Sequence, residues 1–169
     1  NDVVAVTAET DATVLCGSSL GGAVALRVAL DRDIDLDGLV LAGTGATLAV
    51  TPELLDALST DFERAIDYLH EPDRLFPDVP TTHVELSRAA MRECGREVAA
   101  RDFRTCHAFD ARDRLSEVTV PSLAVVGEHD ALTPPASHEY LVDRIANCAY
   151  TVIDDAAHLA MVERPAAFN

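Results

Sequence analysis

The sequence predicts an α/β fold, with a parallel sheet flanked by helices, because three strand-like segments each lead into a residue able to do chemistry. Ser19 lies between an apolar strand-like run and a helix-like run. Asp130 lies just past the apolar run 122–126, which fits a buried parallel strand. His158 follows a shorter predicted strand at 150–153. All three residues are therefore expected above the carboxyl ends of strands.

Residues 17–21 form the pattern Gly-x-Ser-x-Gly, which in a strand, sharp turn and helix context is typical of a nucleophile elbow. The serine of such a turn adopts a strained backbone conformation, and glycine two residues before and after it removes a steric clash. Ser19 is therefore the candidate nucleophile, and the backbone N–H of Leu20 is the candidate donor to an oxyanion. The alternative is a glycine-rich turn that only lets a helix pack closely on a strand.

Asp130 and His158 are the candidate acid and base, and they follow Ser19 in the chain order of one known type of serine triad. His158 would take the Ser19 proton and return it to the leaving group, while Asp130 would fix the imidazole tautomer. Each residue also has a simpler explanation, because aspartate at such a place is often a turn former and a loop histidine is often solvated. If Asp130 does not serve, Glu128 is the first alternative acid.

Three segments carry a resemblance to a known superfamily: V-L-C-G-S-S-L-G-G, V-P-S-L-A-V-V-G-E-H-D-A-L-T-P-P and D-A-A-H-L-A-M-V-E-R-P-A-A-F-N. They resemble the elbow, acid and histidine regions of the α/β-hydrolase superfamily, and are most similar to its small lidded esterase, enol-lactonase and cofactor-free haloperoxidase-like members. The resemblance implies the C-terminal part of an α/β-hydrolase fold with a helical lid insertion. It also implies a cofactor-free serine hydrolase that cleaves a small carboxylic ester, thioester or lactone through an acyl-enzyme on Ser19. Acyl transfer and peracid formation use the same triad and remain open.

The chain departs from that superfamily in two places. Ala157 precedes His158, where the superfamily commonly has glycine. The superfamily's sheet also has several strands before the elbow, including a His-Gly-type loop that supplies a second oxyanion donor, and only about a dozen residues precede the elbow strand here. We therefore expect the N-terminal strands to be absent from this chain, with the missing N-terminal half as its partner. The alternative function is a non-catalytic binding module.

The pattern divides one predicted domain into three parts. Residues 1–46 contain the elbow strand, its helix and a second strand at 38–42, and residues 116–169 contain the acid and histidine segments. Residues 47–115 form the predicted helical lid, in which a helix begins after Thr51 and further helical segments extend over about 82–108. The apolar stripe of that first helix consists of Leu55, Leu58, Phe62, Ile66 and Leu69.

The chain carries 29 acidic residues against 13 basic ones, all arginine, which gives a net charge of −16. Such an excess of carboxylates favours a halophilic, salt-adapted protein, because molar salt screens their mutual repulsion. A high-GC genome also replaces lysine by arginine, but it does not by itself produce the acid excess. The charge balance argues against nucleic-acid binding, since the sequence contains no basic patch.

Cysteine and histidine spacing shows none of the common metal or disulfide patterns. The four cysteines have no C-x-x-C spacing, and Cys16 is expected to be a small buried thiol within its strand. The histidines other than His158 lack partners at metal-ligand spacing, so no metal is expected. The chain shows no signal peptide and no apolar run of about 18 residues. We therefore expect a cytoplasmic protein that acts on a small acyl substrate and not at a membrane.

If the acid excess is an adaptation to salt, the protein should unfold at a higher temperature and turn over faster in about 2 M KCl than in about 0.1 M. At low ionic strength the net charge of −16 causes self-repulsion in the compact state, and salt relieves it. Thermal unfolding across a KCl series measures the effect. A melting temperature that stays level or falls with salt would support the high-GC explanation instead.

Overall fold

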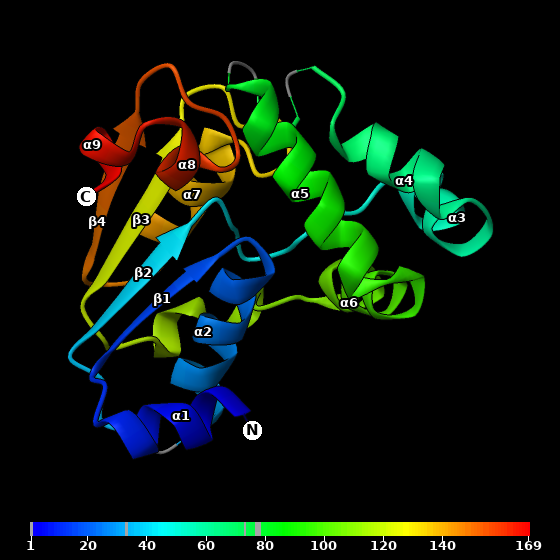
Figure 1. Ribbon diagram of the computed structural model, residues 1–169. Helices are drawn as coiled ribbons and strands as arrows, with labels where there is room; N and C mark the ends of the chain where they lie inside the picture. Colours follow the sequence, from blue (N-terminus) through cyan, green and yellow to red (C-terminus); the bar gives the residue numbers. More distant parts are fainter. Residues whose placement is uncertain (1, 33, 73, 77–78) are drawn as a thin grey trace.

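The computed structural model describes residues 2–32, 34–72, 74–76 and 79–169. Its centre is a parallel sheet of four strands in the order β1-β2-β3-β4 (Figure 1). Helices pack against this sheet, and a separate group of helices, α3 to α6, gathers beside the arrowhead ends of β1 and β2 (Figure 1). This is the predicted α/β architecture of a parallel sheet flanked by helices.

The elements follow one another along the chain in an order that alternates strands with helices except in the helical stretch from α3 to η1 and in the final pair α8 and α9. Their bounds are α1 (Asp2–Thr10), β1 (Val14–Ser18), α2 (Leu20–Asp31), β2 (Gly38–Ala42), α3 (Pro52–Thr60), α4 (Phe62–Leu69), α5 (Thr81–Cys94), α6 (Arg96–Ala108), the 3-10 helix η1 (Arg112–Glu117), β3 (Ser122–Gly127), α7 (Pro135–Val142), β4 (Cys148–Ile153), α8 (Ala160–Glu163) and α9 (Pro165–Phe168). Among the described helices, none is both long and apolar enough to cross a membrane.

The strands occupy the predicted segments, and their register aligns the carboxyl ends of the first three. The predicted strand 38–42 is β2, and β4 begins two residues earlier than predicted, at Cys148. Ser18 pairs with Ala42, and Ala42 pairs with Val125. The residues that follow β1, β2 and β3 therefore emerge side by side at one edge of the sheet.

Each face of the sheet is covered by a different set of helices. Helices α2, η1 and α7 cover one face, where the largest buried side chains are Leu26, Leu39, Leu41, Leu115 and Leu141. Short helix α8 covers the other face, against Ala42, Val125 and Ile153. Alternate residues of a strand point to opposite faces, which is why β2 contributes to both clusters.

Cys16 is exposed, so the prediction of a buried thiol there is wrong. Its neighbour Leu15 packs into the core on the α2 face, and strand alternation therefore turns Cys16 to the opposite face. The buried cluster on that opposite face includes no described residue of β1. Since β1 pairs with β2 alone among the described strands, its side chains on that face have few neighbours to cover them.

The region 47–115 is helical, but its first predicted helix is divided in two. Thr51 caps α3, with its hydroxyl accepting from the backbone N–H of Leu54 at 3.3 Å. Asp61 ends α3 and caps α4 by accepting from the N–H of Arg64 at 3.2 Å. A carboxylate at this place favours a new helix start over continuation. The continuous stripe is thus replaced by a cluster between helices that includes Leu54, Leu58, Ala65, Leu69 and Ala99.

Glycines 17 and 21 give a matched pair of tests for the close contact between β1 and α2. A Cβ on Gly17 would lie 2.2 Å from the backbone oxygen of Gly21, whereas a Cβ on Gly21 meets nothing within 4 Å. Gly17→Ala should therefore destabilise the fold by about 1–3 kcal/mol, and Gly21→Ala should stabilise it by up to about 1 kcal/mol because alanine favours helix. Urea unfolding of both variants measures the difference, and equal effects would contradict it.

Candidate active site

Ser19 occupies the turn between β1 and α2 with φ 53° and ψ −117°, a region that residues other than glycine rarely adopt. The turn is sharp because Gly17 packs directly against the backbone of α2. Ser19 is the N-cap residue of α2, yet its side chain makes no capping hydrogen bond. Its hydroxyl is therefore not used to satisfy the helix. Leu20 is the first residue of α2, where backbone N–H groups have no acceptor inside the helix.

Asp130 follows β3, and its side chain is 0% exposed. The carboxylate Oδ1 accepts from the backbone N–H of Leu132 at 2.9 Å and of Thr133 at 2.8 Å. The carboxylate Oδ2 accepts from the Thr133 hydroxyl at 2.8 Å. Asp130 is therefore a turn former, as the simpler explanation of the sequence suggested, and its loop also holds the carboxylate in one orientation.

His158 contacts this carboxylate through Nδ1, which lies 3.0 Å from Oδ2 and 3.2 Å from Oδ1 of Asp130. A carboxylate only accepts, so Nδ1 carries the proton and Nε2 is the basic nitrogen of the neutral ring. Burial disfavours the charged form of Asp130, but the hydrogen bonds from His158 and Thr133 outweigh it and hold the pKa of Asp130 below its ordinary value. Asp130 is therefore ionised at neutral pH.

Gly43, directly after β2, lies next to this pair and close to the His158 backbone. A Cβ on Gly43 would lie 3.5 Å from both Oδ2 of Asp130 and Cε1 of His158, and 3.0 Å from the His158 carbonyl oxygen. The φ of Gly43 is 50°, which also favours glycine. Strand β2 lies between β1 and β3, so the imidazole lies above the strand that separates Ser19 from Asp130.

The loop that carries His158 reaches its conformation with Ala157 in the place where the resemblance expects glycine. The residue with positive φ in this loop is Asp155, at 54°, and Ala157 has no such conformation. The backbone N–H of Ala157 donates to both carboxylate oxygens of Glu163, at 3.1 Å and 3.0 Å. Burial raises the pKa of Glu163. This contact ties the His158 loop to the last residue of α8.

Ser19 and His158 line the same cavity, which has a volume of about 430 Å³ and lies against helices α3 to α6. That volume falls within the range of small-molecule sites. Most of the wall is apolar, and its large side chains include Leu48, Leu54, Leu69, Leu75, Met91 and Phe103. The structure therefore brings the candidate nucleophile and the candidate base to one apolar pocket, with Asp130 buried behind the base.

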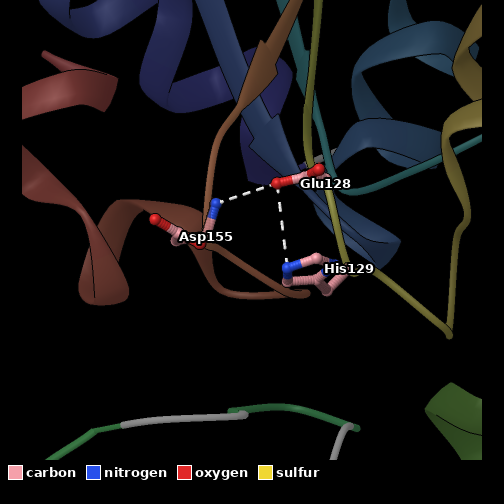
Figure 2. Close-up of side chains that lie close together, drawn as sticks. All are labelled: Glu128, His129 and Asp155. Carbon is pink, nitrogen blue, oxygen red and sulfur yellow. Dashed lines mark hydrogen bonds and ion pairs between the residues drawn. The ribbon is translucent and has the colours of Figure 1, made fainter.

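Glu128, the alternative acid, lies beside His129 and Asp155 (Figure 2) and is not among the residues that line this pocket. Its carboxylate accepts from the backbone N–H of Asp155 at 3.2 Å and lies 3.7 Å from Nε2 of His129. Side-chain ligand atoms of Glu128, His129 and Asp155 all lie within 4.8 Å of one another, so this group has the composition of a weak metal site. All three are exposed, and such surface groups commonly stay solvated. Asp130, not Glu128, contacts His158.

Two residues that support the site were not predicted from the sequence. Thr133 holds the Asp130 carboxylate with both its N–H and its hydroxyl, and a signal was present because the aspartate and threonine are three residues apart, as in a capped turn. Glu163 holds the His158 loop. No signal in the sequence distinguishes this buried acid from the many acidic residues on the surface.

Comparison with known proteins places these observations in a family. The model of the family described as serine aminopeptidase, S33, matches residues 2–165. A pimeloyl-[acyl-carrier protein] methyl ester esterase of Neisseria meningitidis serogroup A is 31% identical over 192 aligned positions, which include 99% of this chain and 57% of that protein. The chain thus spans little more than half the length of this curated relative.

Solved structures of similar proteins have the same fold as this chain. A thermophilic esterase superposes with a TM-score of 0.85 at 33% identity, over 97% of this chain and 65% of that one. Est816, described as an N-acyl homoserine lactone degrading enzyme, superposes with a TM-score of 0.85 at 27% identity, over 99% of this chain and 70% of that one. Both similarities extend over the sheet and the helices α3 to α6, because they include nearly the whole chain.

Replacing Asp130 by asparagine should lower stability at neutral pH by about 1–3 kcal/mol, because buried donors lose a charged acceptor. The folded pKa of Asp130 lies below its ordinary value of about 3.9, so between these two values the unfolded state binds more protons and stability rises with pH. The advantage of the wild type over Asp130→Asn should therefore be complete above about pH 4 and shrink as pH falls through the folded pKa. Urea unfolding at several pH values tests this, and a difference independent of pH would contradict it.

Proposed function

The chain belongs to the serine aminopeptidase S33 family of α/β-hydrolases, and from that membership we propose that it is a serine hydrolase of small carboxylic esters, thioesters or lactones. The observation that carries the proposal is the buried Asp130–His158 pair, whose histidine lines one cavity together with Ser19 at its strained turn. The relatives named as esterases and as a lactone-degrading enzyme support the same class of substrate. Ser19, Asp130 and His158 are the proposed catalytic triad.

In the first half of the proposed reaction, the Ser19 oxygen attacks the acyl carbon while Nε2 of His158 takes the serine proton. Asp130 remains ionised and stabilises the imidazolium through Nδ1. The carbonyl oxygen becomes an oxyanion, to which the N–H of Leu20 is the proposed donor. The bond to the leaving group then breaks, the His158 proton passes to the leaving oxygen or sulfur, and the acyl group remains on Ser19.

In the second half, water enters the place of the leaving group and gives a proton to Nε2 of His158 as its oxygen attacks the acyl carbon. The bond to Ser19 then breaks, and the proton returns from His158 to the serine oxygen. The product is a carboxylic acid, and the site is restored. A lactone follows the same course, except that its leaving group stays attached to the product.

The apolar wall of the cavity supports a substrate whose acyl group is largely apolar. Its wall is apolar over most of its area, with polar groups such as Tyr68, Arg74 and Ser87 contributed by the helical region. Residues 47–115 are accordingly proposed to act as a lid, because this region supplies most of the side chains that line the cavity. The N-acyl and pimeloyl groups named for the relatives belong to this class of substrate.

The composition of the chain supports two proposals about where the protein works: an environment of high salt and a reducing compartment. The acid excess of 29 acidic against 13 basic residues supports adaptation to high salt. The four cysteines, all within the described residues, are free thiols, which supports a reducing compartment and hence the cytoplasm.

An alkyl fluorophosphonate probe should label the protein at Ser19, because it reacts with a serine that a histidine activates. Ser19→Ala should abolish both labelling and hydrolysis of a short-chain ester. Asp130→Asn should slow both by about 10⁴-fold, since the imidazole loses the partner that sets its tautomer. Mass spectrometry of the labelled peptide and ester kinetics provide the measurements.

Ser18→Ala is the matched control, because Ser18 is adjacent in sequence and its hydroxyl is buried without a hydrogen-bond partner among the described residues. This variant should keep full labelling and turnover. Labelling at Ser18 would overturn the assignment of Ser19 as the nucleophile. A wild type that is not labelled at all would overturn the proposed function and favour a non-catalytic binding module.

A further inference from the structure

The strained turn at Ser19 is held from both sides by the end of β2. The backbone N–H of Ser19 donates to the carbonyl of Ala42 at 2.9 Å. The carbonyl of Ser19 accepts from the hydroxyl of Thr44 at 2.9 Å. A strained conformation persists only where surrounding contacts over-determine it, and these two hydrogen bonds enclose the residue that has φ 53°.

Thr44 is fixed in turn by its packing. It is 0% exposed, and a Cβ on Gly22 would lie 2.6 Å to 2.7 Å from three atoms of its side chain. Threonine is stiff at χ1, so contact with the first turn of α2 sets the direction of its hydroxyl. The Thr44 side chain therefore packs against the start of α2 and at the same time holds the Ser19 carbonyl.

His138 of α7 holds the backbone of Thr44 from the other side. The Thr44 N–H donates to Nε2 of His138 at 3.0 Å, and Nδ1 of His138 lies 3.5 Å from the carbonyl of Pro134. His138 is 0% exposed, and burial lowers its pKa. A neutral ring with its proton on Nδ1 is the form that accepts from Thr44. A chain of two hydrogen bonds thus runs from α7 through Thr44 to the nucleophile.

We propose that Thr44 and His138 are positioning residues for Ser19, which set the height and direction of the nucleophile through its backbone carbonyl. This inference rests on the proposed function, because it concerns the rate at which Ser19 attacks. Gly43 lies between Ala42 and Thr44, and a Cβ there would lie 3.0 Å from the His158 carbonyl oxygen and 3.5 Å from Oδ2 of Asp130. The segment 42–44 therefore contacts both Ser19 and His158, so it helps to set the distance between the proposed nucleophile and its base. A shift of about 1 Å in such an arrangement can cost about 10²-fold in rate.

Thr44→Val tests this directly, because valine keeps the shape and the backbone N–H but lacks the hydroxyl. The matched control is Thr7→Val: Thr7 is also buried, and its hydroxyl donates to the Val3 carbonyl at 2.8 Å within α1. We expect kcat for ester hydrolysis and the rate of fluorophosphonate labelling to fall about 10- to 100-fold in Thr44→Val, with KM nearly unchanged. Thr7→Val should match the wild type, and thermal unfolding should show similar small losses for both.

His138→Leu and His138→Gln separate positioning from packing. Glutamine offers an amide oxygen that can accept from the Thr44 N–H, and leucine fills space without an acceptor. His138→Gln should therefore recover most of the turnover that His138→Leu loses. Thr44→Val leaves His138 in place, so it keeps the inference testable if His138→Leu does not fold.

The outcomes distinguish this inference from the function on which it rests. A labelled wild type with equal kcat in Thr44→Val and Thr7→Val would overturn the positioning role and leave the serine hydrolase intact. Equal turnover in His138→Gln and His138→Leu would overturn the role of His138. A wild type that is not labelled at Ser19 would overturn both the inference and the proposed function.

Discussion

The spacing of parallel strands determines the geometry of the whole site. Neighbouring strands lie about 4.8 Å apart, and Ser19 follows β1 while Asp130 follows β3, two strands away. A serine and an aspartate about 10 Å apart cannot interact directly, and an imidazole is of the right length to lie between them. His158 reaches that place from the loop after β4, and its carbonyl oxygen lies so near Gly43, at the end of β2, that a Cβ there would be 3.0 Å away.

The electrostatics of the site follow from this placement. A fully buried carboxylate is costly unless it is paired and hydrogen-bonded, and Asp130 has both kinds of partner: three donors from its own loop and the imidazole of His158. Burial raises the pKa of Asp130, but the hydrogen bonds from His158 and from the Thr133 loop together hold that pKa below its ordinary value. His158, the proposed base, is therefore oriented before any substrate enters, and little reorganisation is left for the proposed reaction.

The parts of the site that are local in sequence were predictable, and the parts that join distant segments were not. Ser19 and Asp130 lie at strand ends, where the apolar pattern stops and turn residues begin. The contact between Thr44 and His138 joins residues 94 positions apart, and a buried histidine in a helix has no pattern that names its acceptor. Exposure of Cys16 was missed for a related reason, since an apolar strand does not indicate which of its faces a helix will cover.

The charges on the surface and the buried charge of the proposed Asp130–His158 pair are physically separate. Several of the arginines form ion pairs on the surface, such as Arg92 with Glu63 and Arg114 with Asp31, whose side chains are between 29% and 60% exposed. Salt screens exposed pairs strongly and buried pairs little. The Asp130–His158 pair is 0% and 4% exposed, so added salt should act on the stability of the fold while leaving the orientation of the base unchanged. An acidic surface can therefore be tuned to its ionic surroundings without altering the chemistry at Ser19.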